Sequence, residues 1–439
     1  SIRKKSEPKR MRIMKLSKAC RVICNIEKKK VIVANLDNGT WILIPLSCWE
    51  IVRKMDEQNV DPEVIYANAY DNEDESYLRY ILGKLLDYDF LVPEEKLSDT
   101  YKCEIRKVAI NLTYRCNLRC RHCCVDAKHV SEFTEEDELN TEQLKEVFEK
   151  SAALNPEQIV LSGGEPMVRK DFMELLYYLR KHFKNKISLS TNGLLITESN
   201  IKYLNNCIDK YDISIDGVDE ESCSRIRGKG VFKKVIESIE LIKKYGDKEI
   251  YLSMMFDDFN ENLRGEFLQL CKRLGVHPLM RAFEPMGRGA ENWKDFEKNE
   301  EEHHVEQYSK EELEEARSNL MCFSCAAGRK EIMINPKGDI FPCGNLNVKD
   351  FCMGNILQIN NINNFFNGNF FDMQRCNEGV NMLEQSYPYN FHECKECNVN
   401  LFCWSCISGI RNRYTDPVRF KKECRDKKAI LERVVWGEE

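Results

Sequence analysis

Three cysteines lie close together near the end of the first quarter of the chain. The run CNLRCRHC places Cys116, Cys120 and Cys123 in a C-x3-C-x2-C spacing, which presents three thiolates to one point from a single loop. A four-iron cluster takes four ligands, so three protein thiolates leave one iron open, much as a catalytic metal site keeps one position for its substrate. The run therefore indicates an iron-sulfur cluster that binds a further ligand.

A second group of cysteines lies near the end of the chain. Its eight members are Cys322, Cys325, Cys343, Cys394, Cys397, Cys403, Cys406 and Cys424. Eight thiolates saturate two four-iron clusters, and they also satisfy two tetrahedral zinc sites. The zinc interpretation is weaker, because paired C-x2-C motifs in zinc sites are separated by about 12 residues or more, whereas five residues lie between Cys397 and Cys403. The other ten of the 21 cysteines are scattered, and we expect them to be small buried hydrophobic residues.

Glycines and small polar residues follow three of the strands that the sequence predicts. The segments are SGGEP at 162–166, STNG at 190–193 and SIDG at 214–217. Gly163 and Gly164 allow backbone to approach a ligand, and the Glu165 carboxylate can accept hydrogen bonds from an ammonium group. Any one segment is also what a tight strand-to-helix turn needs, but their alignment at successive strand ends argues for a binding site. The polar side chains aligned there are Ser190, Asn192, Ser214 and Asp216.

Strand and helix patterns alternate through the middle of the chain and position these residues. A β-branched run at 107–112 precedes the cysteine loop, and Asn140 with Gln143 forms a capping box that starts a helix. Further strands are expected at 158–162, 187–191, 211–215, 249–255 and 279–283, with amphipathic helices between them. Six strand-helix repeats predict an α/β fold with a parallel sheet, either doubly wound or a partial barrel, with its chemistry at the carboxyl ends of the strands.

Together, these motifs resemble the radical S-adenosylmethionine (radical SAM) enzymes, whose hallmark is C-x3-C-x2-C after the first strand of a partial (β/α)6 TIM-like barrel. The resemblance covers residues 107 to about 283. It implies a [4Fe-4S] cluster held by Cys116, Cys120 and Cys123, with SAM on the open iron. In this family one electron splits SAM into methionine and a 5'-deoxyadenosyl radical, which takes a hydrogen atom from the substrate. The SAM contacts that the resemblance implies are His122 near the adenine, Gly163, Gly164 and Glu165 at the methionine amino group, and Ser190, Asn192, Ser214 and Asp216 near the ribose and carboxylate.

The second cysteine group resembles the SPASM extension of the same superfamily. The fit includes the interval from Cys325 through Gly338 to Cys343, and one spacing departs, because two residues instead of three separate Cys403 from Cys406. The resemblance implies two auxiliary [4Fe-4S] clusters, making three clusters in all. It assigns Cys322, Cys325, Cys343 and Cys406 to the first and Cys394, Cys397, Cys403 and Cys424 to the second. Neither would then have an open iron; without Cys322, the first would be open to a substrate thiolate.

The front of the chain has a different character. Three short strand patterns, a DNG turn at 37–39 and three helical patterns suggest a winged helix-turn-helix domain over residues 1–100, and Ser47 with Glu50 predicts a capping box for the first helix. DNA binding is one interpretation of such a domain. Ahead of a radical SAM-SPASM enzyme, it looks more like the recognition element of ribosomal peptide maturases. A leader peptide would then add a strand to the open edge of its sheet.

Composition limits the remaining choices. A chain of 439 residues needs several domains, and we expect a barrel at 101–310 and a SPASM domain at 311–439. The 66 basic and 72 acidic residues nearly cancel, so no overall charge favours nucleic acid or a membrane as partner. No long apolar run or signal-peptide pattern is found, which predicts a cytoplasmic protein whose cysteines stay reduced.

These features predict a peptide-modifying radical SAM enzyme. Its partners would be a precursor peptide and a reducing electron donor such as flavodoxin or ferredoxin. The layout looks most like the streptide-type cyclases that join lysine to tryptophan through a carbon-carbon bond. Thioether formation is the runner-up, and a sulfatase-maturing enzyme that forms formylglycine is a weaker alternative. A non-catalytic iron-sulfur or zinc protein that senses redox state or binds DNA has no use for the Gly163-Gly164-Glu165 segment. No catalytic base is assigned.

Overall fold

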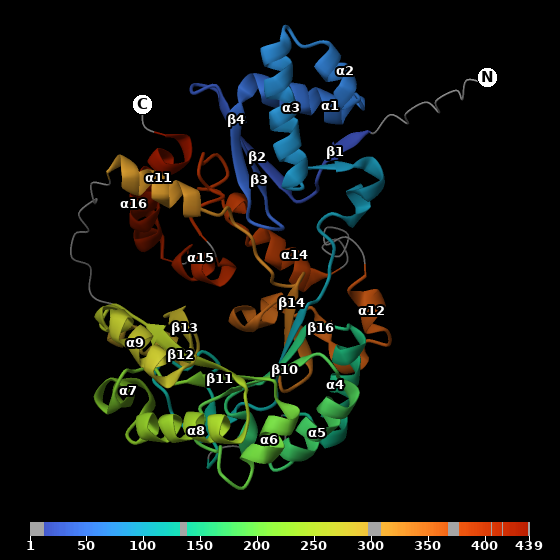
Figure 1. Ribbon diagram of the computed structural model, residues 1–439. Coiled ribbons are helices and arrows are strands. Elements are labelled where there is room, and N and C mark those ends of the chain that lie inside the picture. Colours follow the sequence, from blue (N-terminus) through green and yellow to red (C-terminus); the bar gives the residue numbers. More distant parts are fainter. Residues whose placement is uncertain are drawn as a thin grey trace.

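The middle of the chain forms a sheet of parallel strands with helices along its outer side (Figure 1). The computed structural model describes residues 13–131, 138–296, 309–367, 377–404, 406–414 and 416–437. Six parallel strands follow one another across the sheet: β6 (Lys107–Asn111), β9 (Gln158–Ser162), β10 (Lys186–Thr191), β11 (Lys210–Ser214), β12 (Glu249–Phe256) and β13 (His277–Ala282). Consecutive strands are neighbours, which confirms the predicted partial (β/α)6 barrel and rules out a doubly wound order.

The helices between the strands follow the predicted pattern. They are α4 (Thr141–Ala153), α5 (Phe172–His182), α6 (Ile201–Cys207), α7 (Glu220–Arg227), α8 (Val231–Tyr245) and α9 (Arg264–Leu274). The capping box of Asn140 and Gln143 is present at the start of α4, which buries Leu144, Val147 and Phe148 on one face. Each helix packs its apolar face against the sheet and returns the chain to the amino end of the next strand. All six strands therefore end at the same edge.

The C-terminal region continues this sheet, which the sequence did not predict. Strand β14 (Glu331–Ile334) pairs parallel to β6, and β15 (Asp339–Phe341) and β16 (Gly354–Asn355) follow it in antiparallel order. The helices of this region are α11 (Lys310–Asn319), α12 (Ile362–Phe365), α14 (Glu378–Gln385), α15 (Ile407–Tyr414) and α16 (Pro417–Trp436). The region is thus joined through main-chain hydrogen bonds to the strand that precedes the cysteine loop.

The front of the chain is a small antiparallel sheet with helices on one face. Strands β2 (Cys20–Asn25), β3 (Lys30–Asn35) and β4 (Trp41–Pro45) form the predicted meander, accompanied by α1 (Leu46–Gln58), α2 (Pro62–Ala67), α3 (Asn72–Asp87) and the pair β1 (Met14–Leu16) and β5 (Leu91–Pro93). Val31, Val33 and Ile44 pack against α1 and α3. The capping box predicted at Ser47 is wrong, because α1 already begins at Leu46 and has no side-chain cap. The Leu46 N–H donates instead to the Lys29 carbonyl in the turn between β2 and β3.

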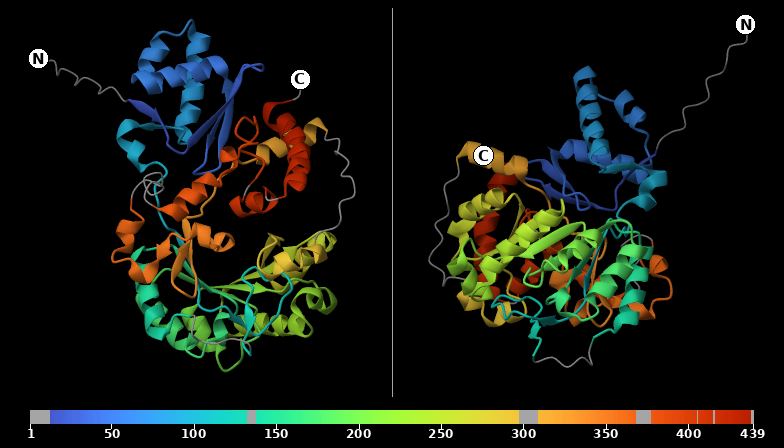
Figure 2. Two further views of the ribbon diagram at one scale, coloured as in Figure 1. Left: turned by 180° about the vertical axis from the view of Figure 1, so that it is seen from behind. Right: turned by 60° about the horizontal axis from the view of Figure 1, so that its bottom comes forward.

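The other face of this sheet lies on the C-terminal region, as the left view in Figure 2 shows. The Trp41 and Phe402 rings meet edge to face with centroids 5.0 Å apart, and Trp41 Nε1 donates to the Leu320 carbonyl at 2.7 Å. At the tip of the β3–β4 hairpin, the Asp37 carboxylate lies 2.5 Å from the Arg329 guanidinium and 2.6 Å from the Lys330 ammonium. The hairpin is therefore held by aromatic packing and by ion pairs.

The scattered cysteines differ in burial. Cys207, Cys223 and Cys271 lie in the barrel core, as expected, whereas Cys24 and Cys124 are exposed. Cys376 lies outside the described residues. Among the helices of the described segments, we find none that is both long and apolar enough to cross a bilayer.

Replacing Asp37 tests the contact between the front sheet and the C-terminal region. Asp37→Ala leaves the Arg329 charge buried without its ion-pair partner. The Asp37 side chain is 38% exposed, so the pair contributes less to stability than a fully buried pair would. We expect the free energy of unfolding to fall by about 2 kcal/mol, against about 3 to 5 for a fully buried pair. Chemical denaturation measures the change. Asp99→Ala breaks an exposed ion pair with Lys102 and should cost less than about 1 kcal/mol; equal losses would contradict the prediction.

Candidate functional site

The cysteine loop begins at the carboxyl end of β6. Cys116 belongs to β7 (Arg115–Cys116), which pairs with β8 (Lys128–His129) and closes the loop at its base. Backbone N–H groups face two of the sulfurs, from Leu118 to Cys116 at 3.4 Å and from Ala127 to Cys123 at 3.3 Å. Burial raises the pKa of Cys116 to about 11, and the nearby Cys120 and Cys123 add to the increase. The three predicted thiols are thus close enough to interact.

Gly163 and Gly164 lie directly against the backbone that leads into this loop. A Cβ atom on Gly163, whose φ is +141°, would lie 2.3 Å from the Thr113 carbonyl oxygen, and one on Gly164 would lie 2.3 Å from that of Arg115. The backbone N–H groups of Gly164 and Glu165 donate to these same two carbonyls at 2.8 Å. No side chain fits between the segments, so the two glycines are needed to bring the second strand end against the cysteine loop.

Glu165 joins the ends of β9 and β10. Its fully buried carboxylate accepts hydrogen bonds from Thr191 Oγ1 at 2.9 Å, the Asn192 N–H at 2.8 Å and the Met167 N–H at 3.2 Å. Burial raises the pKa of Glu165 to about 7, against the effect of these donors. The sequence suggested a ligand ammonium as the partner of this carboxylate, and the structure gives it partners within the protein.

Of the other polar residues at the strand ends, Asn192 contacts the cysteine loop and the two serines do not. The Asn192 side-chain amide donates to Asn117 Oδ1 at 2.7 Å and lies 3.9 Å from Cys116 Sγ. Ser190 and Ser214 are half-buried at the ends of β10 and β11, on the same edge of the sheet. The structure thus brings Asn192 to the cysteine loop, and it places the two serines beside this site without a hydrogen bond among the described contacts.

Asp216 is the centre of a buried charged cluster. Its Oδ2 atom lies 2.6 Å from the Arg227 guanidinium and 2.8 Å from His122 Nε2, and its Oδ1 accepts from the Met255 N–H at 2.7 Å. Burial alone would raise the pKa of Asp216, but Arg227 and His122 hold it well below the ordinary value. Arg227 also reaches Cys120, with Nη1 3.8 Å from the sulfur. A cationic donor therefore faces one cluster thiolate, and a carboxylate fixes its position.

The loop is also held from its far side. Arg288, in the short helix α10 (Arg288–Glu291), donates through Nη1 to the Cys120 carbonyl at 3.0 Å and through its backbone N–H to that of Cys123 at 2.9 Å. Sequence reasoning missed both Arg227 and Arg288. The pattern gave no signal for them, because each lies on a helix far along the chain, outside any motif of fixed spacing.

The C-terminal cysteines gather in two places. Cys325, Cys343 and Cys406 interact with one another, and burial with this interaction raises the pKa of Cys343 to about 12. The second set is Cys394, Cys397, Cys403 and Cys424, whose members all interact. Cys322 stands apart: its thiol donates to the Asn35 and Thr40 carbonyls of the front sheet at 3.5 and 3.4 Å. The structure therefore brings together ten of the eleven predicted ligands, in sets of three, three and four.

The donor chemistry of these sets fits iron-sulfur clusters. Within the described part of the chain, no three Cys, His, Asp or Glu side chains converge closely enough to share a single metal ion. In a cubane each thiolate binds a different iron, so the sulfurs surround a larger volume than one ion needs. At the first set, His122 Nδ1 is buried without a hydrogen-bond partner among the described residues, which leaves a polar atom for a ligand there.

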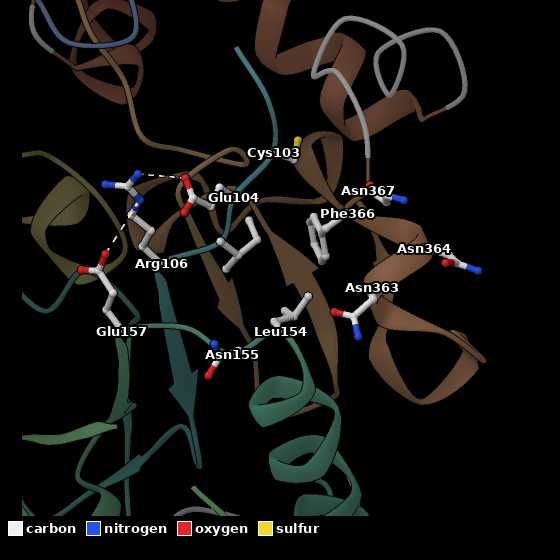
Figure 3. A pocket seen from close by; sticks show the side chains of 11 residues that line it. Cys103, Glu104, Arg106, Leu154, Asn155, Glu157, Asn363, Asn364, Phe366 and Asn367 are labelled. Carbon is white, nitrogen blue, oxygen red and sulfur yellow. Dashed lines mark hydrogen bonds and ion pairs between the residues drawn. The ribbon is translucent and has the colours of Figure 1, made fainter. Parts of the chain in front are cut away.

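A pocket of about 490 Å³ lies at the opposite edge of the sheet (Figure 3). It is lined by residues that precede β6 and β9 and by α12 and the residues just after it. Arg106 pairs there with Glu104 at 2.8 Å and lies 3.9 Å from Glu157. Parallel barrels carry their chemistry at the carboxyl edge. This pocket is therefore separate from the candidate site.

Comparisons with known proteins identify two regions of the chain. Residues 110–297 match the Radical SAM superfamily, and residues 325–398 match the iron-sulfur cluster-binding domain called SPASM. The chain therefore carries a region that matches the radical SAM superfamily, followed by a region that matches the SPASM domain. These domains imply [4Fe-4S] clusters and SAM as cofactors.

Two curated proteins and one solved structure are similar to this chain. Mycofactocin maturase MftC of Mycolicibacterium smegmatis is 29% identical over 263 residues, which are 56% of this chain and 66% of that protein, just under two thirds. The antilisterial bacteriocin subtilosin biosynthesis protein AlbA of Bacillus subtilis is 28% identical over 326 residues, covering 69% of this chain and 68% of that protein. The structure of Streptococcus suis SuiB bound to precursor peptide SuiA aligns over 91% of this chain and 97% of that chain, with a TM-score of 0.50 and 14% identity. SuiB therefore shares the fold.

The raised pKa of Glu165 predicts that the stability of the folded protein depends on pH. Its pKa is about 7 in the folded protein against an ordinary 4.5, so the folded state keeps a proton that the unfolded state has released between these values. Its contribution to stability is complete below pH 4.5 and is lost as the pH rises through about 7, a change of about 3 kcal/mol. Glu165→Gln should remove this slope in denaturation curves measured without SAM. Glu198→Gln, an exposed control, should follow the wild type.

Proposed function

We propose that this protein is a radical SAM peptide maturase. It takes a hydrogen atom from a residue of a ribosomally made precursor peptide and forms an intramolecular cross-link. The observation that carries this proposal is the three-thiol loop at the carboxyl edge of the barrel. The same chain also has a front domain in which β4 forms one edge of a three-stranded sheet, where a peptide strand could pair. The names of MftC as a maturase and AlbA as a bacteriocin biosynthesis protein support a peptide substrate, as does the precursor peptide bound to SuiB.

The residues have distinct tasks in this proposal. Cys116, Cys120 and Cys123 would hold the catalytic cluster. With SAM and one electron from a donor such as flavodoxin or ferredoxin, that cluster would supply the 5'-deoxyadenosyl radical chemistry. Gly163 and Gly164 bring backbone beside that cluster for the SAM amino group. Asn192, Ser190, Ser214 and His122 line the remainder of the SAM site. Asp216 positions Arg227, whose guanidinium faces Cys120. The set Cys394, Cys397, Cys403 and Cys424 would hold a fully ligated auxiliary cluster, one of the three clusters that we expect in the chain.

The domain at residues 1–100 would recognise the leader through the free edge of β4. Asn35 N–H donates to the Thr40 carbonyl, and the β3–β4 register then turns the backbone N–H and C=O groups of Trp41 and Leu43 away from β3. A groove of about 620 Å³ runs along this edge, with Glu314 and Arg317 of α11 among the residues of its wall. An added strand would satisfy the open groups of β4 while its side chains contact the groove.

A carbon-carbon bond between lysine and tryptophan remains our preferred product, and a thioether is the alternative. Both remove two hydrogens from the precursor, but only a thioether requires cysteines. Blocking the cysteines of the precursor therefore separates the two reactions. The sulfatase-maturing alternative is disfavoured, because such an enzyme has no use for a front domain with an open sheet edge. The reduced cysteines that the clusters need favour a cytoplasmic location.

Iron content and SAM cleavage test the proposal. After anaerobic reconstitution we expect about 12 irons per chain, falling to about 8 when Cys116, Cys120 and Cys123 are all changed to Ala. The wild type should form 5'-deoxyadenosine from SAM under reductant, and the variant should form none. A control with the buried Cys48, Cys207 and Cys271 changed to Ala loses the same number of thiols and should keep both properties. Intact clusters without 5'-deoxyadenosine would refute the enzyme assignment.

A proline substitution in β4 tests whether a leader peptide pairs with this strand. Leu43→Pro removes an outward N–H that a leader strand would use, so we expect the affinity for the precursor peptide to fall about tenfold or more. Fluorescence anisotropy with a labelled precursor peptide measures this affinity. Val22→Pro makes the same change at the opposite edge of the same sheet, on β2, and should leave the affinity unchanged. A loss confined to Val22→Pro would move the leader site to β2.

A further inference from the structure

Arg329 carries a buried positive charge in the segment that follows Cys325. Its side chain is 3% exposed, and its Cζ lies 4.4 Å from the centroid of the buried Tyr101 ring. Its Nη1 pairs with the Asp37 carboxylate at 2.5 Å, whereas Nε and Nη2 are buried and have no hydrogen-bond partner among the residues that the structure describes. Buried guanidinium donors ordinarily have partners, so two open donors on a buried cation indicate an anionic group nearby.

The charges around Arg329 do not cancel one another. The Asp37 carboxylate also lies 2.6 Å from the Lys330 ammonium, so two cations share one anion. In the described segments we find no second carboxylate that pairs with either cation, and the neighbouring Glu331 pairs with Lys107 at 3.2 Å. Lys330 is 26% exposed and can be hydrated, whereas Arg329 is almost fully buried. A net positive charge therefore lies inside the protein at Arg329, which is costly without a compensating anion.

The Arg329 guanidinium lies near the thiols of the first C-terminal set. The N–H of Gly328, the residue before Arg329, donates to the Pro342 carbonyl at 2.9 Å, which holds this turn against the residue before Cys343. Burial raises the pKa of the Cys325 thiol to about 12, and the nearby Arg329 opposes part of that increase. The buried cation is therefore within electrostatic reach of a predicted cluster ligand.

We propose that Arg329 compensates the charge of the first auxiliary cluster, at Cys325, Cys343 and Cys406, and raises its reduction potential. This inference rests on the proposed function, because it requires the SPASM clusters. One-electron reduction makes a thiolate-bound cluster more negative, and a fixed cation beside the sulfurs stabilises the reduced form. Arg329 is in this proposal a positioning residue that acts through the cluster, and it is not one of the ligands.

A higher potential suits the electron that cross-linking releases. Forming a cross-link removes two hydrogens from the peptide. The 5'-deoxyadenosyl radical takes one of them as an atom, and the other leaves as a proton, which goes to solvent, and an electron. The first auxiliary cluster would accept this electron and gain one negative charge. Arg329 would favour the transfer, because its charge opposes the one that is added in a place remote from water.

A purely structural role for Arg329 predicts a different pattern. The Asp37–Arg329 pair fastens the front hairpin to the segment before β14, so removing either member would loosen the same contact. A structural role therefore predicts that both losses change the cluster in the same direction. The charge argument instead predicts that loss of Arg329 lowers the potential, whereas loss of the Asp37 carboxylate leaves the cation in place and does not lower it.

Potentiometric titration followed by electron paramagnetic resonance tests this proposal in the full-length protein whose three loop cysteines are changed to Ala. This parent should hold about 8 irons. Arg329→Met should lower the equilibrium constant for reduction of one of the two auxiliary clusters about tenfold or more, which is about 59 mV for one electron, and should leave the other unchanged. The matched control Lys330→Met removes a more exposed cation from the same carboxylate, so we expect a change of less than about twofold. Asp37→Asn should not lower the constant.

The outcomes separate this inference from the proposed function. An unchanged potential in Arg329→Met, an equal fall in Lys330→Met or a fall in Asp37→Asn would overturn the role of Arg329. If Arg329→Met binds less iron than the parent, the double change Asp37→Asn with Arg329→Met removes both members of the pair, and the same tenfold fall is expected from it. A parent without about 8 irons would instead overturn the proposed function itself.

Discussion

The close contact between two backbone segments at the edge of the barrel determines the geometry of the site. Gly163 and Gly164 lie against Thr113 and Arg115 with no side chain between them, and hydrogen bonds join the segments. This contact sets the start of the cysteine loop relative to β9. Glu165 then extends the arrangement to β10 by accepting from Thr191 and Asn192. Three successive strand ends are thus fixed to one another by contacts within the protein.

A buried ion pair lies on the other side of the cysteine loop. Arg227 carries a buried positive charge toward the cysteines, which is tolerated because Asp216 pairs with it at 2.6 Å. Asp216 takes a positive φ of 53°, a strained conformation for a residue with a side chain, and its three hydrogen-bonding partners keep it there. A thiolate cluster is anionic, so a fixed guanidinium near Cys120 provides compensating charge where the cluster would be held.

The front domain, the barrel and the C-terminal region are joined by direct contacts. Strand β14 extends the barrel sheet beside β6, and the segment immediately before it carries Cys325, Arg329 and Lys330. The same segment receives the tip of the front hairpin through Asp37. A peptide strand added at β4 would therefore lie on a sheet that is directly attached to the segment holding an auxiliary-cluster thiol.

The sequence by itself determined the features that depend on local spacing. The three cysteines of one loop, the glycine pair after β9, the capping box of α4 and the six strand-helix repeats all follow from residues near one another in the chain, and the repeats identified a partial barrel through family resemblance. The tertiary structure decided what depends on distant segments. Arg227 reaches Cys120 from 107 residues away, and Cys322 bonds to Asn35 across 287 residues. The resemblance to SPASM domains assigned Cys322 to the first auxiliary cluster, whereas its thiol donates to carbonyls of the front hairpin. Hydrogen bonding and packing act between neighbours in space, so only the tertiary structure could show this contact.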